Sequence, residues 1–75
     1  MPQVIFAGWQ SGLQKISLAH LLHEKADLGG RAAKECVDLL LADEGFAVEV
    51  STVEQAHDLA LHASKLGAVC HVKLD

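Results

Sequence analysis

Two histidines and a glutamate are the side chains of this sequence best suited to metal or proton chemistry. His20 and His23 lie three residues apart, and Glu24 follows them directly. Residues three apart share one face of a helix, so two imidazoles and a carboxylate are available there as zinc ligands. However, the order His-x-x-His-Glu differs from the His-Glu-x-x-His of zinc enzymes. We therefore expect surface histidines without a bound metal, and a zinc site remains an alternative.

The same two histidines offer proton binding as a second chemistry. An unperturbed imidazole titrates near about pH 6.5. If His20 and His23 lie on a binding face, their protonation near about pH 6 adds positive charge to that face. This hypothesis predicts a partner affinity that changes with pH, and it makes a small zinc- or pH-responsive protein one alternative function.

Other patterns argue against catalysis. Cys36 and Cys70 fall inside apolar runs, where nothing lowers the pKa of a thiol. The serines lack a nucleophile-elbow context, and the glycines form no phosphate-binding fingerprint. His57, His62 and His71 are expected to be solvated. We therefore predict no enzyme, no catalytic residues and no cofactor.

Composition limits the remaining classes. The chain has 75 residues and a net charge of −4, whereas a nucleic-acid binder needs clustered lysine and arginine. Residues 1–7 do not resemble an export signal, and no apolar run approaches the length that spans a membrane. We expect one domain over residues 1–75, in the cytoplasm, with reduced cysteines.

Hydrophobic periodicity predicts the elements of the first half of the chain. A strand is expected over 3–7, a glycine-bounded loop over 8–12, and helices over 13–26 and 31–42. Glycine readily adopts positive φ after a helix, so Gly29–Gly30 is expected to end the first helix. The expected apolar stripes are Ile16, Leu18, Ala19, Leu21, Leu22 and Ala26 on the first helix, and Ala33, Cys36, Val37 and Leu40 on the second.

The sequence pattern of the second half of the chain predicts a strand, a helix and a second strand. Alternation over 46–51 and 68–74 is typical of half-buried strands. Between them, Ser51 with Glu54, or Thr52 with Gln55, forms a capping box, and Gly67 ends the helix. Side chains expected to point inward are Phe46, Val48, Val50, Val53, Ala56, Leu59, Ala60, Ala63, Leu66, Ala68, Cys70, Val72 and Leu74.

This order predicts an α+β fold, β-α-α-β-α-β. Amphipathic helices and half-buried strands bury their apolar faces best as two layers. We expect a two-layer sandwich in which three helices cover one face of a three-stranded antiparallel sheet.

Most of the chain resembles the C-terminal domain of the bacterial ribosomal stalk protein (L-seven/L-twelve). The matching residues are Lys15-Ile16, Leu28-Gly29, Ala33-Lys34-Glu35 and Cys36-Val37-Asp38, with Thr52, Glu54, Ala56 and Gly67-Ala68 further on. The resemblance implies the same fold and a non-enzymatic module that docks a protein partner, a translational GTPase or ribosome-associated factor, on its first two helices. By this resemblance the partner-binding residues are Lys15, Ile16, Ser17, Ala19, His20, His23, Leu28, Gly29, Gly30, Arg31 and Lys34.

Alternatives remain for these features. Gly29–Gly30 is either a plain break between helices or the low corner of a docking face. The stretch "EGFAVEVSTVEQA" is similar to the Clp-protease adaptor family, which shares this fold, so a substrate-delivery adaptor is the second function considered. That family uses an Asn-Asp-Asp run where this chain has Gly8-Trp9-Gln10-Ser11. Trp9 is expected to fold over the end of the core, with partner binding as its alternative.

Overall fold

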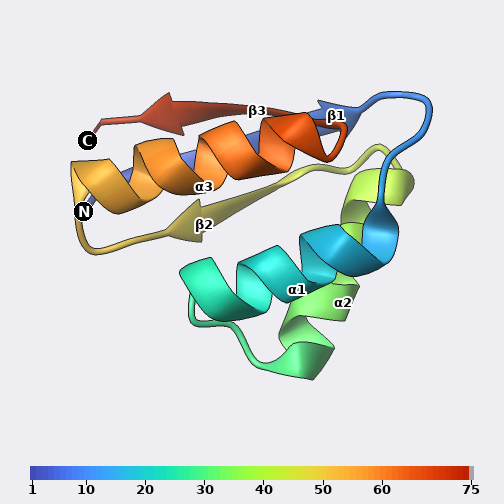
Figure 1. Ribbon diagram of the computed structural model, residues 1–75, viewed down its shortest axis with the longest axis horizontal. Coiled ribbons are helices and arrows are strands. Elements are labelled where there is room, and N and C mark those ends of the chain that lie inside the picture. The colour runs from blue at the N-terminus through green and yellow to red at the C-terminus, as the bar shows by residue number, and fades with distance from the viewer. Residues whose placement is uncertain (75) are drawn as a thin grey trace.

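Three strands and three helices follow in the order β-α-α-β-α-β in the computed structural model, which describes residues 1–74. The strand β1 lies in the middle of the sheet and pairs antiparallel with β2 and with β3, giving the order β2-β1-β3 (Figure 1). The expected α+β fold is therefore confirmed. The elements are β1 (Gln3–Trp9), α1 (Lys15–Lys25), α2 (Gly30–Leu41), β2 (Phe46–Glu49), α3 (Val53–Lys65) and β3 (Ala68–Lys73).

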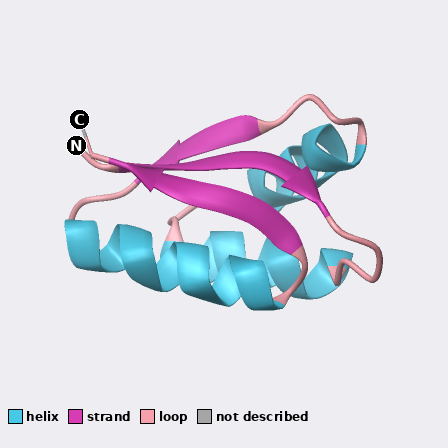
Figure 2. Ribbon diagram, turned by 90° about the horizontal axis from the view of Figure 1, so that it is seen from above, coloured by secondary structure: helices cyan, strands magenta, loops and turns pink. Residues whose placement is uncertain are grey.

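The core lies between the sheet and the helices. Val4 and Phe6 of β1 are fully buried, and the ring of Phe6 stacks on that of Phe46 at a centroid distance of 4.5 Å. Helices α2 and α3 pack on the sheet, while α1 packs on α2 and α3 and buries Leu18 and Leu22. Figure 2 shows helices below and beside the sheet and none above it. One face of the sheet is therefore left uncovered.

The first strand is longer than its sequence pattern indicates. It continues to Trp9, and a register shift between Phe6 and Gly8 places Trp9 opposite Ala68 of β3. A bulge adds one residue to a strand without ending its pairing, which alternation alone does not reveal. The expected loop over 8–12 is thus wrong for its first two residues. Trp9 is 40% exposed and lies outside the buried core, so it does not seal the end of the core as expected.

The corner between α1 and α2 is built differently from the expectation. Asp27, not a glycine, has the positive φ of 57° that turns the chain after α1. Gly29 is the N-cap of α2 with φ −63°, and Gly30 is the first residue of that helix. The prediction that these glycines end the first helix is therefore wrong, because an aspartate tolerates the left-handed conformation. Both glycines are exposed, so the corner is open to a partner.

Both ends of α3 are formed as the sequence predicts. Of the two possible capping boxes, the one formed by Thr52 and Gln55 is present: the amide of Gln55 donates to Thr52 Oγ1 at 3.1 Å. Gly67 follows the helix with φ 105°. Val53 and Leu74 were expected to point inward, but both are exposed: Val53 is the first residue of α3, and Leu74 lies beyond the end of β3.

Candidate functional site

Ile16 is the described apolar side chain that departs furthest from its expected place. Periodicity assigned it to the buried stripe of α1, whereas the resemblance assigned it to the docking face, and it is 83% exposed. Leu18 and Leu22 of the same helix are fully buried. At 100° per residue, Ile16 stands roughly 200° from Leu18, on the opposite side of the helix. Ile16 is the most exposed of the large apolar side chains that the structure describes, so it is accessible to a partner.

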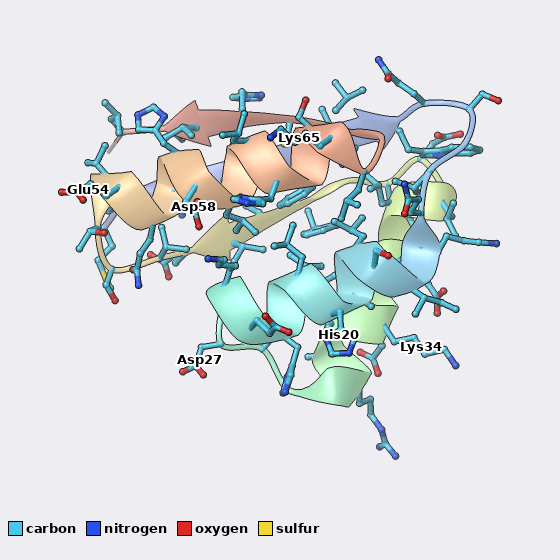
Figure 3. The ribbon with its side chains drawn as sticks, in the orientation of Figure 1. His20, Asp27, Lys34, Glu54, Asp58 and Lys65 are labelled. Atoms are coloured by element: carbon cyan, nitrogen blue, oxygen red, sulfur yellow. The ribbon has the colours of Figure 1, made fainter. Side chains whose placement is uncertain are left out.

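Ile16 borders a groove between α1 and α2 with a volume of about 350 Å³. Its lining is mostly apolar and also includes two lysines and an aspartate. We call it the hairpin groove, and it is lined by Lys15, Ile16, Ala19, Lys34, Val37, Asp38 and Leu41. Figure 3 labels Lys34 on α2, on the side of the molecule away from the sheet. The groove therefore joins an apolar floor to two ammonium groups.

The cations at this site are not neutralised within the chain. In the part that the structure describes, Lys15, Arg31 and Lys34 form no ion pair. Lys25, in contrast, is held by Asp58 of α3. An unpaired lysine at the rim of an apolar groove keeps its charge free for a group on a partner, and such rim charges steer association.

The structure brings together only part of the predicted binding surface. Lys15, Ile16, Ala19 and Lys34 meet at the hairpin groove, whereas Gly29, Gly30 and Arg31 lie beyond it at the exposed corner. Leu28 is partly buried against the core. The predicted partner-binding residues did not include three further lining residues, Val37, Asp38 and Leu41. The sequence could have indicated these residues, because the spacing of positions 34, 37, 38 and 41 places them on one side of a helix.

His20 faces a different groove, between α1 and α3. This groove has a volume of about 530 Å³ and also contains His62 and Lys65. Nδ1 of His20 lies 3.3 Å from the carboxylate of Glu24, one helical turn further on. Ile16 borders both grooves. His20 is therefore near the predicted docking face but is not in the hairpin groove.

His23 contacts the chain's own backbone. Its Nδ1 lies 2.6 Å from the carbonyl oxygen of Leu28, so the Nδ1–H tautomer donates a hydrogen bond across the turn after α1. This contact links the end of α1 to the segment that leads into α2. In residues 1–74, no group of three or more His, Cys, Asp or Glu side chains is arranged to hold a metal ion. His23 thus has a structural role at the corner.

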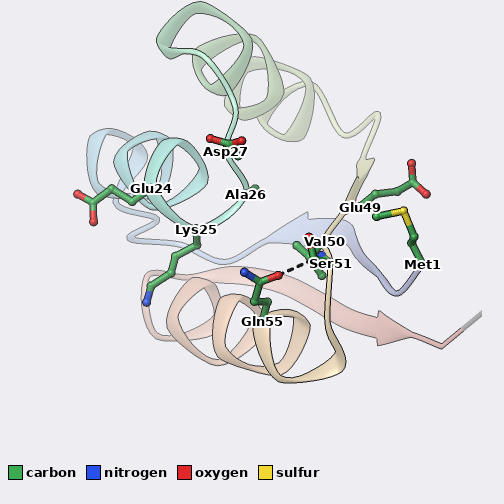
Figure 4. A pocket seen from close by; sticks show the side chains of 9 residues that line it. All are labelled: Met1, Glu24, Lys25, Ala26, Asp27, Glu49, Val50, Ser51 and Gln55. Atoms are coloured by element: carbon green, nitrogen blue, oxygen red, sulfur yellow. Dashed lines mark hydrogen bonds between the residues drawn. The ribbon is translucent and has the colours of Figure 1, made fainter.

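A third groove lies where α1, β2 and α3 approach one another (Figure 4). Its volume is about 500 Å³ and its lining is mostly polar. Gln55 accepts a hydrogen bond there from the amide of Ser51 at 3.0 Å, as part of the start of α3. Figure 4 shows the carboxylates of Glu24, Asp27 and Glu49 at separate places around the groove. They do not converge on one ligand position.

The cysteines lie in environments that make their thiols less reactive. Both were expected to be buried, but each is only partly buried and free. Burial raises the pKa of the Cys36 thiol, and the neighbouring carboxylate of Glu35 raises it further. Burial alone raises the pKa of Cys70, whose Sγ donates to the carbonyl of Ala60 at 3.5 Å. The expectation that neither environment lowers a thiol pKa is confirmed.

The turn after β1 is fixed by the backbone of the opposite turn. The amide of Gln10 donates to Gly67 O at 2.8 Å, and that of Gln14 donates to Leu66 O at 2.9 Å. These bonds hold the segment 10–14 against the turn between α3 and β3. Among residues 1–74, no helix is both long and apolar enough to cross a bilayer.

The hairpin groove thus combines an exposed apolar anchor, a mostly apolar lining and unpaired charges on the two helices of the predicted docking face. This combination suits recognition of another protein better than chemistry on a small molecule. Neither the protein-family models nor the curated proteins compared with this chain include a match to it.

Proposed function

We propose that this protein is a non-enzymatic interaction module that binds a partner protein at the hairpin groove. The observation that carries the proposal is Ile16, 83% exposed beside an apolar groove whose rim holds the unpaired Lys15 and Lys34. Central apolar anchors surrounded by polar groups supply most of the binding energy in protein interfaces. The partner surface that fits is an amphipathic helix with an apolar side chain for the groove and carboxylates for the lysines.

The resemblance to the stalk C-terminal domain suggests the class of partner. It assigns docking to the first two helices, and the hairpin groove lies between those two helices. A translational GTPase or another ribosome-associated factor in the cytoplasm is therefore the partner we propose. The positions that hold His20 and His23 usually carry lysine or arginine in that family. Positive charge for the partner would then come mainly from Lys15, Arg31 and Lys34.

Isothermal titration calorimetry with a purified translational GTPase tests this function. Ile16→Ser should weaken binding by about tenfold or more, because it removes the apolar anchor. Leu61→Ser is the matched control, since Leu61 is 55% exposed on α3, away from the groove. Lys34→Glu should also weaken binding, and more strongly at low salt. Absence of binding, or equal losses for the two serine variants, would rule out a GTPase partner docked at this groove.

A further inference from the structure

The charges of α2 run against its helix dipole. Arg31 is the second residue of the helix, no acidic residue lies in its first turn and no basic residue in its last. Asp43 and Glu44 follow the carboxyl end directly. Negative charge is favourable at the amino end of a helix and positive charge at the carboxyl end, so α2 has the unfavourable arrangement. Its N-cap, Gly29, also provides no side-chain hydrogen bond.

The third helix has the opposite, favourable arrangement. Glu54 lies in its first turn, His62 and Lys65 lie in its last turn, and a capping box closes its start. Both helices belong to the same small domain and are exposed on one side. The inverted charges of α2 are therefore a local feature of this helix. A local feature that opposes the stability of its own element is often retained for an interaction.

Lys34 and Asp38 place these opposite charges in the hairpin groove. Both line it, one helical turn apart, together with Leu41 from the same side of α2. Neither forms an ion pair within the described residues. Along this side, α2 therefore runs from positive at Arg31 and Lys34 to negative at Asp38. Such a stripe is complementary to an identical stripe that runs in the opposite direction.

We propose that the hairpin groove binds a second copy of this chain, with the two α2 helices packed antiparallel about a two-fold axis. In this dimer, Lys34 of each copy faces Asp38 of the other, so the same Lys34–Asp38 ion pair forms twice. Arg31 of each copy lies near Asp43 and Glu44 of the other. The two helix dipoles oppose each other, which offsets the unfavourable charges of each helix.

The dimer also covers the exposed apolar groups of the groove. Ile16 projects from α1 beside α2, where it closes over the helix of the second copy, and Leu41 lies between the two helices. The uncovered face of the sheet is the other apolar surface considered. It exposes Val69 together with Lys73 of β3 and Glu49 of β2, which lie on either side of Gln3 of β1. On α2, in contrast, both charges line one groove together with the exposed Ile16, so we place the interface there.

This dimer does not depend on the function proposed above. Only one consequence rests on that function: a second copy and the partner protein would compete for the hairpin groove. Self-association would then limit partner binding at high concentration of this protein, since each dimer occupies two grooves.

Sedimentation velocity with two charge-reversal variants tests the dimer. Wild-type protein, studied from about 1 μM to about 1 mM, should form dimers that weaken as salt rises. Lys34→Asp and Asp38→Lys should each be monomeric, because each places like charges opposite one another at both symmetric contacts. An equimolar mixture should form a heterodimer, since Asp at 34 of one variant then faces Lys at 38 of the other, and the remaining Asp38 and Lys34 also pair.

Lys73→Asp is the control, because it reverses a lysine on β3 and should leave the dimer unchanged. Circular dichroism should show all three variants folded, since each substituted side chain is exposed. A wild-type monomer at about 1 mM would overturn the dimer, as would variants that fail to recombine. Loss of the dimer in Lys73→Asp alone would show that the chains associate through the sheet and not through α2. GTPase binding that still depends on Ile16 in a monomeric wild type would overturn the dimer but retain the proposed function.

Discussion

Nζ of Lys25 at the end of α1 lies 2.8 Å from Oδ2 of Asp58 on α3. Figure 3 shows Asp58 on the side of α3 that faces α1. The hydrogen bond to Asp58 and its negative charge raise the pKa of Lys25. The hydrogen bond from Lys25 in turn lowers the pKa of Asp58, against the opposing effect of desolvation. The pair therefore links two helices and helps to orient α1, the helix that carries Ile16.

We predict that Lys25→Met lowers the melting temperature only over a defined pH range. Asp58 has a lowered pKa, so its contribution is present above its unfolded value of about 3.9 and is lost as pH falls through the folded pKa. Lys25 has a raised pKa, so its contribution is present below about 10.4 and is lost as pH rises through the folded pKa.

Thermal melts followed by circular dichroism, with wild type and variant compared between about pH 2 and about pH 11, check this range. The difference in melting temperature should be largest near neutral pH and low salt, because the exposed pair is screened by ions. A difference that is the same at about pH 2 and about pH 7 would show that the ion pair contributes nothing.

Gly30→Ala should stabilise the protein by about 0.4–1 kcal/mol. Gly30 is the first residue of α2, it does not have positive φ, and an added Cβ would meet nothing within 4 Å. Alanine restricts the unfolded chain more than glycine does, without strain in this folded conformation. Urea unfolding measures the effect.

Gly45→Ala is the contrasting variant. Gly45 has a φ of 69°, and an added Cβ would lie 2.8 Å from the carbonyl oxygen of Phe6. This substitution should therefore destabilise by more than about 1 kcal/mol. Equal effects of the two substitutions in urea would contradict the assigned conformations.

Arg31→Glu should stabilise the fold while it weakens association. The substitution places a carboxylate at the second position of α2, where the helix dipole favours it by about 0.3–1 kcal/mol. The same change reverses a charge at the proposed docking face. Urea unfolding at a dilution where the protein is monomeric, together with sedimentation at high concentration, separates the two effects. A less stable monomer would contradict the role assigned to the charges of α2.

His23→Ala should destabilise the protein by about 0.5–1.5 kcal/mol, because it removes the hydrogen bond to Leu28 that joins α1 to the corner. His20→Ala is the matched control on the same helix. It removes only a surface contact with Glu24, so a smaller effect is expected. Hydrogen exchange at the amides of the corner between α1 and α2 would show whether the loss of stability occurs there. Similar protection of those amides in both variants would show that His23 does not hold the turn.

The sequence by itself determined the features that depend on neighbours along the chain. Val4 and Phe6 alternate toward the core, Leu18 and Leu22 share one helical face, and Thr52 caps α3 through Gln55. Each of these follows from the period of a strand or a helix, or from a side chain that reaches its own backbone. For this reason the element order and the antiparallel α+β fold could be predicted.

Only the tertiary structure decided the features that depend on how elements pack. Periodicity gives α1 a broad apolar stripe, but the position of α2 and α3 decides that Leu18 is buried and Ile16 is exposed. The pairing of β1 with β3 carries the first strand on to Trp9. The hairpin groove is lined by residues from both α1 and α2, so it depends on how these two helices pack, which involves side chains distant in sequence.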